Sequence, residues 1–214
     1  MEALRREGDR VVPAGPKARR TRAQLIEAAT TLFAEQGFAN TAVAQIAERA
    51  GVSLGTFYQY FRNRDEVLAA LVSHQIEAIR ADQDRQGWRV GAGLEALERV
   101  LLIYVQGYTR AIDLSRVWES VSQTEPAMTE LRRAAGRAST EPLARELLRA
   151  GKAGLMRPMP KREAQLTARA LAGMIDRMCF DLFVLDPPEP PATEAEVASL
   201  VARLWAGALG LETE

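Results

Sequence analysis

The chain has 214 residues, of which 47% are hydrophobic and 26% are charged, and its 28 Lys and Arg balance its 28 Asp and Glu. This length lies between one and two average domains, and the hydrophobic content is enough for a sizeable core. No apolar run reaches the roughly 18 residues that a membrane-spanning helix needs, and the polar start lacks the apolar stretch of a signal peptide. We therefore expect a soluble, cytoplasmic globular protein.

The counts of cysteine and histidine exclude two further classes of protein. Cys179 is the single cysteine and cannot form an internal disulfide, and with His74, the single histidine, it leaves too few ligands for a structural zinc site. We expect neither a metal site nor a cofactor. Residues 1–64 carry 10 Lys and Arg against 6 Asp and Glu, whereas the remainder carries 18 against 22. This surplus of positive charge favours a nucleic-acid partner at the N-terminal end.

Residues 1–18 combine proline, glycine and charged residues without apolar periodicity, which predicts a disordered basic leader. A short basic arm follows at its end, made of Lys17, Arg19, Arg20 and Arg22. Such an arm either is a solvated tail or touches DNA phosphates or the minor groove, as arms do in other helix-turn-helix proteins. The sequence leaves both possibilities open.

Three helices are predicted next, of which the second and third are short. Thr21 is a possible N-cap for the first helix, which Gly37 ends by taking the left-handed conformation easily. Thr41 is a possible cap for the second helix, which ends at Gly51. The third helix is expected to begin after Ser53 and to bury two phenylalanines, Phe57 and Phe61.

Two short helices joined by a tight turn containing glycine have the spacing of a helix-turn-helix, whose second helix enters the major groove of DNA. In this chain the DNA-entering helix would be the one after Ser53, and its outward positions offer small, hydroxyl and amide groups that suit contacts with base edges and phosphates. These positions are Leu54, Gly55, Thr56, Tyr58, Gln59 and Tyr60. The alternative is an ordinary helical hairpin whose tyrosines complete a core.

The segment IAERAGVSLGTFYQYFRNRDEVL, within residues 21–68, resembles the DNA-binding domain of the TetR family of transcriptional regulators. The resemblance implies that Leu54, Gly55 and Tyr58 approach base edges. It also implies that the DNA backbone is held by Thr41, Ser53, Thr56, Gln59 and Tyr60. Arg64, where the family often has lysine, would face a phosphate. Ala44 replaces a long basic residue that is common in the family, and Gln45 is a possible substitute for it.

Further helices are predicted after Asp65, separated by a glycine-containing loop at residues 87–93 and by the proline-rich segment 187–191. Pro142 is expected to bend its helix or to begin a new one capped by Ser139 or Thr140. Thr193 and Glu196 have the spacing of a capping box for the last helix.

The resemblance also implies a sensor cavity and a twofold dimer in the second part of the chain. An adaptable apolar cavity wall would be lined by Tyr104, Tyr108, Trp118, Met128, Met174, Met178 and Phe180. The alternative for each of these residues is plain core. Close packing of the last two long helices in a dimer is favoured by small residues, namely Ala170, Gly173, Gly207 and Ala208.

We therefore predict an all-α protein with a disordered leader at residues 1–18, a DNA-binding domain at 19–64 and a ligand-binding and dimerisation domain at 65–210. The predicted function is that of a homodimeric repressor, which a small apolar or amphipathic effector releases from an inverted-repeat operator in double-stranded DNA. The alternative is a DNA-bound scaffold controlled by a protein partner. No glycine-rich phosphate loop or nucleophile elbow is present in the sequence, so an enzyme is not expected.

Overall fold

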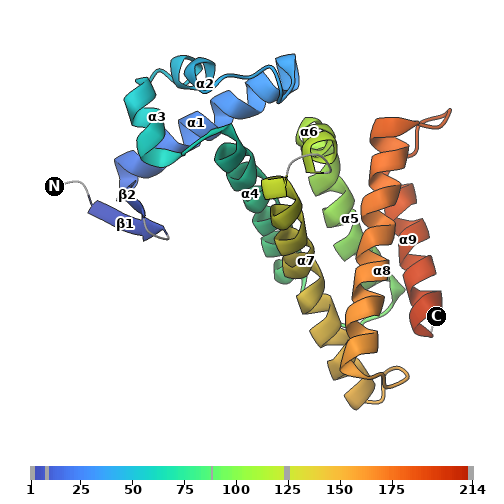
Figure 1. The fold of residues 1–214 in the computed structure, drawn as a ribbon. Coiled ribbons are helices and arrows are strands. Elements are labelled where there is room, and N and C mark those ends of the chain that lie inside the picture. Colours follow the sequence, from blue (N-terminus) through green and yellow to red (C-terminus); the bar gives the residue numbers. More distant parts are fainter. Residues whose placement is uncertain (1–2, 8–9, 88, 123–125, 212–214) are drawn as a thin grey trace. The chain divides into compact units, whose positions relative to one another are not determined.

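The computed structural model describes residues 3–7, 10–87, 89–122 and 126–211. Apart from one hairpin the described chain is helical, which confirms the predicted all-α class (Figure 1). The elements are β1 (Ala3–Glu7), β2 (Arg10–Ala14), α1 (Pro16–Gln36), α2 (Val43–Arg49), α3 (Leu54–Tyr60), α4 (Arg64–Gln86), α5 (Leu94–Arg110), α6 (Ile112–Ser122), α7 (Pro126–Lys152), α8 (Lys161–Phe180), η1 (Asp181–Leu185) and α9 (Glu194–Leu209).

The chain forms two compact units. The first unit contains residues 1–74 and 116–131, and the second contains residues 75–115 and 132–214. The boundary falls inside α4, whereas the sequence predicted a domain boundary at residue 64. That predicted boundary stays a prediction.

The sequence predicted a disordered leader at residues 1–18, whereas in the structure β1 and β2 pair as an antiparallel hairpin in which Leu4 lies opposite Pro13. Val11 and Val12 are β-branched and favour an extended backbone, a signal that the neighbouring prolines and charges outweighed in the sequence. β2 also packs against α1 and α3. Such packing supplies support that an isolated two-stranded hairpin lacks.

Helix α1 begins earlier than predicted, at Pro16 rather than after Thr21. Proline is suited to the first helical position because its fixed φ matches the helix and its missing N–H would have no partner there. The predicted basic arm is therefore part of α1. Gly37 ends the helix as predicted, with φ of 81°, and Phe38 packs back so that its ring centroid lies 5.0 Å from that of Phe33.

The turn between α2 and α3 is a Schellman motif. Gly51 has φ of 69°, its N–H donates to Glu48 O, and the N–H of Val52 donates to Ala47 O. Both hydrogen bonds satisfy carbonyl groups that the end of α2 would otherwise leave without partners. The predicted tight turn at Gly51 is confirmed.

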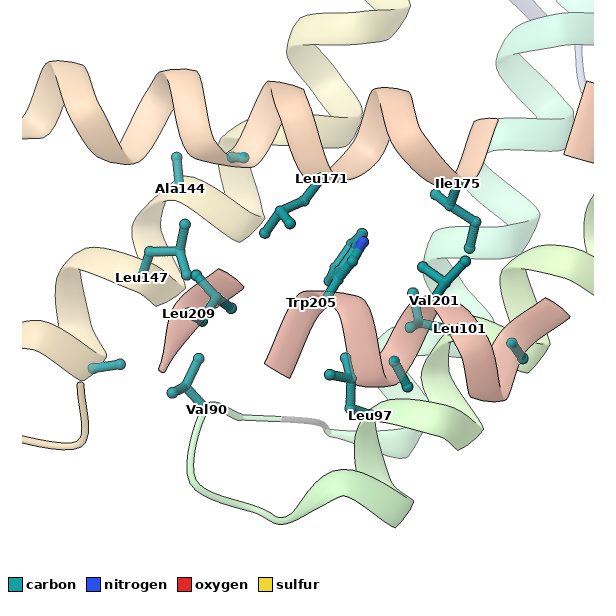
Figure 2. Close-up of a cluster of buried hydrophobic side chains, with 14 of the residues drawn as sticks. Val90, Leu97, Leu101, Ala144, Leu147, Leu171, Ile175, Val201, Trp205 and Leu209 are labelled. Carbon is teal, nitrogen blue, oxygen red and sulfur yellow. The ribbon is translucent and has the colours of Figure 1, made fainter. Parts of the chain in front are cut away.

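The core of the second unit is built mainly by α5, α8 and α9, with the C-terminal part of α7. Figure 2 shows Trp205 of α9 among aliphatic side chains, with Leu171 and Ile175 contributed by α8 and Leu101 contributed by α5. Trp205 is 6% exposed, and Leu101 is 2% exposed. Burial of an aromatic ring of this size is a large part of what holds three helices together.

The sequence predicted a bend or a new helix at Pro142 and a capping box at Thr193. α7 continues through Pro142, so no new helix begins there, and Thr140 instead donates its hydroxyl to Gly136 O at 2.7 Å. At the start of α9 the predicted capping box is confirmed. Glu196 N–H donates to the Thr193 hydroxyl at 3.2 Å, and Thr193 N–H donates to the Glu196 carboxylate at 2.8 Å.

Candidate nucleic-acid interface

The outer face of α3 is the exposed surface of the helix-turn-helix. Ser53 is its N-cap, as predicted, because its hydroxyl accepts the N–H of Thr56 at 3.1 Å. The inner face carries Phe57 and Phe61, which are 0% and 1% exposed. These buried rings fix the orientation of the helix, so the side chains on the opposite face are presented to solvent in a defined direction.

Two large side chains remain exposed on this helix. Leu54 is 45% exposed and Tyr58 is 51% exposed. Because the chain itself covers only about half of these two side chains, their apolar surface is available for contacts with a partner. Gln59 is also exposed, and Thr56 is half-buried with its hydroxyl hydrogen-bonded to that of Ser53 at 2.9 Å.

Gly55 lies on α3 with no close neighbour on its open side. A Cβ placed there would meet only the hydroxyl of Ser53, at 3.8 Å, which is an ordinary contact. The backbone of Gly55 has no positive φ that would require glycine. Within the described chain neither packing nor backbone conformation requires a glycine here, so a requirement would have to come from a partner that approaches the backbone closely.

Two of the residues predicted to touch DNA are buried. Thr41 is 1% exposed, and its hydroxyl donates to Gly37 O at 2.8 Å, so it anchors the turn between α1 and α2 instead of capping α2. Ala42 is the N-cap residue of that helix. Tyr60 is 7% exposed and belongs mainly to the core. Tyr60 follows Phe57 by three residues, and side chains at that spacing lie on the same face of a helix, so Tyr60 shares the inner face of α3 with Phe57.

Gln45 is exposed, but its side-chain oxygen has two partners. It accepts the N–H of Ala42 at 2.8 Å and the side-chain amide of Gln36 at 3.1 Å. The first bond satisfies a donor at the start of α2. The prediction that Gln45 replaces a basic groove contact therefore competes with a capping role that the sequence did not reveal.

Among the predicted DNA-binding residues, Arg64 has the surroundings that differ most from the predicted role. Its Nη1 atom donates to the backbone oxygens of Phe38 and Ala39, both at 2.8 Å, and of Thr41 at 3.1 Å. The guanidinium also lies over the ring of Phe38, 4.6 Å from its centroid. Arg64 is thus held against the turn between α1 and α2, whereas the predicted role was to face a phosphate.

The other cations of this unit have different surroundings. Arg22 lies 5.2 Å from the ring centroid of Phe61, and Arg49 pairs with Glu35 at 2.8 Å between two exposed side chains. The hydrogen bond to Glu35 raises the pKa of Arg49. Arg62, next to the end of α3, is exposed. Exposed arginines beside a protruding helix suit sequence-independent contacts with phosphates.

In the second unit one polar pair stands among the predicted ligand-binding residues. The hydroxyl of Tyr104 donates to the carboxylate of Asp176 at 3.1 Å. Burial, and next the nearby charge of Asp176, raise the pKa of Tyr104 well above its ordinary value. Tyr108, Met174 and Met178 pack against the same core cluster. The Tyr104 and Asp176 pair thus places polar atoms beside the apolar side chains of this core cluster.

The remaining predicted ligand-binding residues have less in common. Phe180 lies 5.3 Å from the guanidinium of Arg177, which pairs with Asp181 at 2.6 Å. Trp118 is half-buried but belongs to the first unit. Met128 lies on α7, but its side chain is outside the described part of the structure. Cys179 is buried, and burial raises the pKa of its thiol to about 12, so a reactive thiolate is not expected.

Among the described residues no helix is both long enough and apolar enough to cross a membrane.

Comparison with known proteins identifies the first unit. Residues 25–71 match the family model described as bacterial regulatory proteins, tetR family. Over 65 residues the chain is 42% identical to the HTH-type transcriptional regulator HbdR of Aromatoleum sp. (strain CIB), a match that covers 30% of this chain and 28% of HbdR. The chain thus matches less than a third of the length of that relative.

A longer match includes the second unit. Over 160 residues the chain is 30% identical to the HTH-type transcriptional regulator BetI of Serratia proteamaculans, which covers 72% of this chain and 77% of BetI.

Solved structures share the fold. A TetR-family regulator from Syntrophomonas wolfei aligns with a TM-score of 0.76 at 18% identity, covering 90% of this chain and 96% of that one. FadR of Thermus thermophilus, a TetR-family repressor solved in complex with lauroyl-CoA, aligns with a TM-score of 0.62 at 25% identity, covering 86% and 92%. The chain belongs to the tetR family of bacterial regulatory proteins and is a DNA-binding transcriptional regulator.

Proposed function

We propose that the protein is a homodimeric repressor that binds an inverted-repeat operator and is released by a small apolar or amphipathic effector. The observation that carries the DNA-binding half of this proposal is the exposed face of α3 behind its buried phenylalanines. Leu54, Gly55 and Tyr58 would approach base edges in the major groove, while Ser53, Thr56 and Gln59 would approach the DNA backbone.

The proposal of a dimer is supported by two exposed stripes on α8 and α9. Along α8 the residues at intervals of four and three, Leu166, Ala170 and Gly173, are all exposed. Along α9 there is a second exposed stripe, made of Leu200, Leu204, Gly207 and Ala208. Leu166 is 56% exposed and Leu204 is 46% exposed. Small residues beside exposed leucines allow helices of two copies to approach closely and bury an apolar surface.

The oligomeric state tests this part. Leu204→Glu places a charge in the proposed interface, and sedimentation analysis should then show monomers at concentrations where the parent is a dimer. Leu155→Glu is the matched control, since Leu155 is 47% exposed, close to the 46% of Leu204, but lies outside α8 and α9. A parent that sediments as a monomer, or a Leu204→Glu variant that remains dimeric, contradicts the proposal.

The proposal of an effector is supported by the composition of the second unit and by a relative. The Tyr104 and Asp176 pair supplies a polar group beside methionines and apolar core residues. FadR of Thermus thermophilus was solved in complex with lauroyl-CoA. We infer that an effector with an apolar chain enters this region and favours a conformation in which α4 has moved, which changes the separation of the two DNA-reading helices.

A tenfold loss of DNA affinity needs only about 1.4 kcal/mol of differential effector affinity between the two conformations. Lauroyl-CoA is the first probe to use. It should raise the midpoint of thermal unfolding and weaken binding to operator DNA, and Tyr104→Phe should reduce both effects. If neither lauroyl-CoA nor a panel of apolar metabolites changes DNA binding, the alternative of control by a protein partner is favoured.

A further inference from the structure

The turn between α1 and α2, residues 37–42, is held by side chains from three helices. From α1, the side-chain amide of Gln36 donates to Asn40 O and to the Thr41 hydroxyl, both at 3.3 Å. From α2, Gln45 accepts the N–H of Ala42 at 2.8 Å. From α4, Arg64 donates to three backbone oxygens of the turn and stacks on Phe38.

Arg64 itself is fixed because it lies in the first turn of α4. The side-chain oxygen of Asn63 accepts the N–H of Glu66 at 2.9 Å, which caps the helix. The carboxylate of Glu66 in turn accepts the N–H of Arg62. The backbone that carries the Arg64 side chain is therefore ordered on both sides, and its guanidinium reaches the turn from a fixed position.

We propose that Arg64 is a positioning residue for DNA binding, which fixes α2 and α3 to the start of α4 so that the DNA-reading surface moves with α4 as one body. The chain of contacts is continuous. Arg64 holds the turn that precedes α2, the Schellman motif at Gly51 joins α2 to α3, and Phe57 buries the inner face of α3. The proposal rests on the DNA binding of the family and needs no effector.

The competing role is a contact with a DNA phosphate. A surface hollow of about 380 Å³ lies beside Arg64, between residues 38–43 and 63–65, so a phosphate has room to approach. A phosphate contact needs a positive charge, which lysine also supplies as a point charge. The positioning role needs the planar guanidinium, because an ammonium can donate to carbonyl oxygens but cannot at the same time lay a flat group over the ring of Phe38. Arg64→Lys therefore separates the two roles.

The first measurement is amide hydrogen exchange in the free, effector-free protein. The N–H of Thr41 donates to Phe38 O at 3.2 Å and that of Ala42 donates to Gln45, so both amides report on the order of the turn. In Arg64→Lys their exchange should be about tenfold faster, since hydrogen bonds to charged groups contribute enough for such a change. Arg62→Lys, the same substitution at an exposed neighbour, should leave the exchange unchanged.

The second measurement is DNA affinity as a function of salt. Positioning predicts that Arg64→Lys loses about tenfold in affinity while the slope of log affinity against log salt is unchanged. A phosphate contact predicts affinity close to that of the parent for Arg64→Lys, and a slope smaller by about 0.9 for Arg64→Ala. Parent-like exchange together with parent-like affinity in Arg64→Lys overturns the proposal.

A second variant keeps the test decisive if Arg64→Lys does not fold. Phe38→Leu retains apolar bulk but removes the ring beneath the guanidinium. It should speed exchange at Thr41 and Ala42 in the same direction and leave the salt slope unchanged, and unchanged exchange in this variant also overturns the proposal. Both measurements are made without an effector. A negative result for Arg64 therefore does not argue against control by an effector, and a protein that responds to no effector could still show the predicted role of Arg64.

Discussion

The side-chain amide of Gln75, on α4, donates to the backbone oxygen of Gly107, on α5, at 2.6 Å. Gly107 lies in the last turn of α5, where the N–H of Ala111 donates to Tyr108 O instead. Gln75 therefore satisfies a carbonyl that the end of the helix leaves without its usual partner. One turn further along α4, Ile79 lies 2.5 Å from the position that a Cβ on Gly107 would occupy. The close approach of α4 and α5 depends on this glycine.

We expect Gly107→Ala to destabilise the protein by about 1 to 3 kcal/mol, because the new methyl overlaps Ile79 and forces the two helices apart. Urea unfolding followed by circular dichroism measures this. Gly136→Ala is the control, since Gly136 also lies inside a helix but nothing is within 4 Å of its Cβ position. The control should gain up to about 1 kcal/mol from helix propensity. Equal stabilities for the two variants would show that α4 and α5 do not approach as described.

Gly55→Ala should separate folding from DNA binding. The added methyl meets only the Ser53 hydroxyl at 3.8 Å, so the free protein should be unchanged or more stable by at most about 1 kcal/mol. DNA affinity should nevertheless fall by about tenfold or more if the backbone of α3 approaches the bases closely. Unfolding curves and fluorescence titration with labelled DNA give the two values. If Gly55→Ala binds DNA as tightly as the parent, the backbone at Gly55 does not approach the bases closely.

Tyr58→Ala should weaken binding to the preferred DNA site by about 1 to 3 kcal/mol and relax the sequence preference. Stability should change little, because Tyr58 is 51% exposed and its main ring contact is an edge-on approach to Phe57 at 5.6 Å. Titrations against preferred and altered sites measure both effects. Tyr58→Phe isolates the hydroxyl. An unchanged preference in Tyr58→Ala would remove this residue from the DNA-reading surface.

The carboxylate of Glu146, on α7, accepts the N–H of Val90 at 2.8 Å and pairs with Arg149 at 2.7 Å and with Arg89 at 3.8 Å. Burial by itself would raise the pKa of Glu146. The hydrogen bonds from Arg149 and Val90 outweigh this effect and, with the charges of Arg149 and Arg89, lower the pKa below its ordinary value of 4.5. The charged form is thus favoured by folding.

A carboxylate with a lowered pKa in the folded protein stabilises it above the unfolded-state pKa, and this contribution is lost as the pH falls through the folded-state value. Glu146→Gln should therefore cost about 1 kcal/mol near neutral pH, and the difference from the parent should shrink below about pH 4.5. Urea unfolding at a series of pH values measures it. A difference that grows as the pH falls would contradict the sign.

The local signals of the helix-turn-helix were sufficient to predict it from sequence. Ser53 caps α3, Gly37 and Gly51 end the preceding helices, and Phe57 faces inward, because each of these roles depends on residues only a few positions away. The same reasoning explains the correct prediction of the Thr193 capping box.

The differences between the predicted and the observed surroundings concern contacts between distant positions, and the predicted phosphate contact of Arg64 stays a prediction. The partners of Arg64 lie 23 to 26 residues earlier in the chain, so no local pattern distinguishes a bond to carbonyl oxygens from a contact with phosphate. The burial of Thr41 and Tyr60 depends on how three helices pack together. In the second unit the hydrogen bond from Tyr104 to Asp176 spans 72 positions, so no local pattern in the sequence could show that these two side chains meet.

Selection of bound DNA from random sequence tests the central claim most directly, because it requires both the reading face of α3 and the pairing of two copies. The parent should enrich an inverted repeat whose half-sites lie about one helical turn apart or somewhat more. Leu204→Glu should weaken binding to the full repeat far more than to a single half-site. Enrichment of no sequence, or of a single half-site without its inverted copy, would contradict a dimeric reader of this kind.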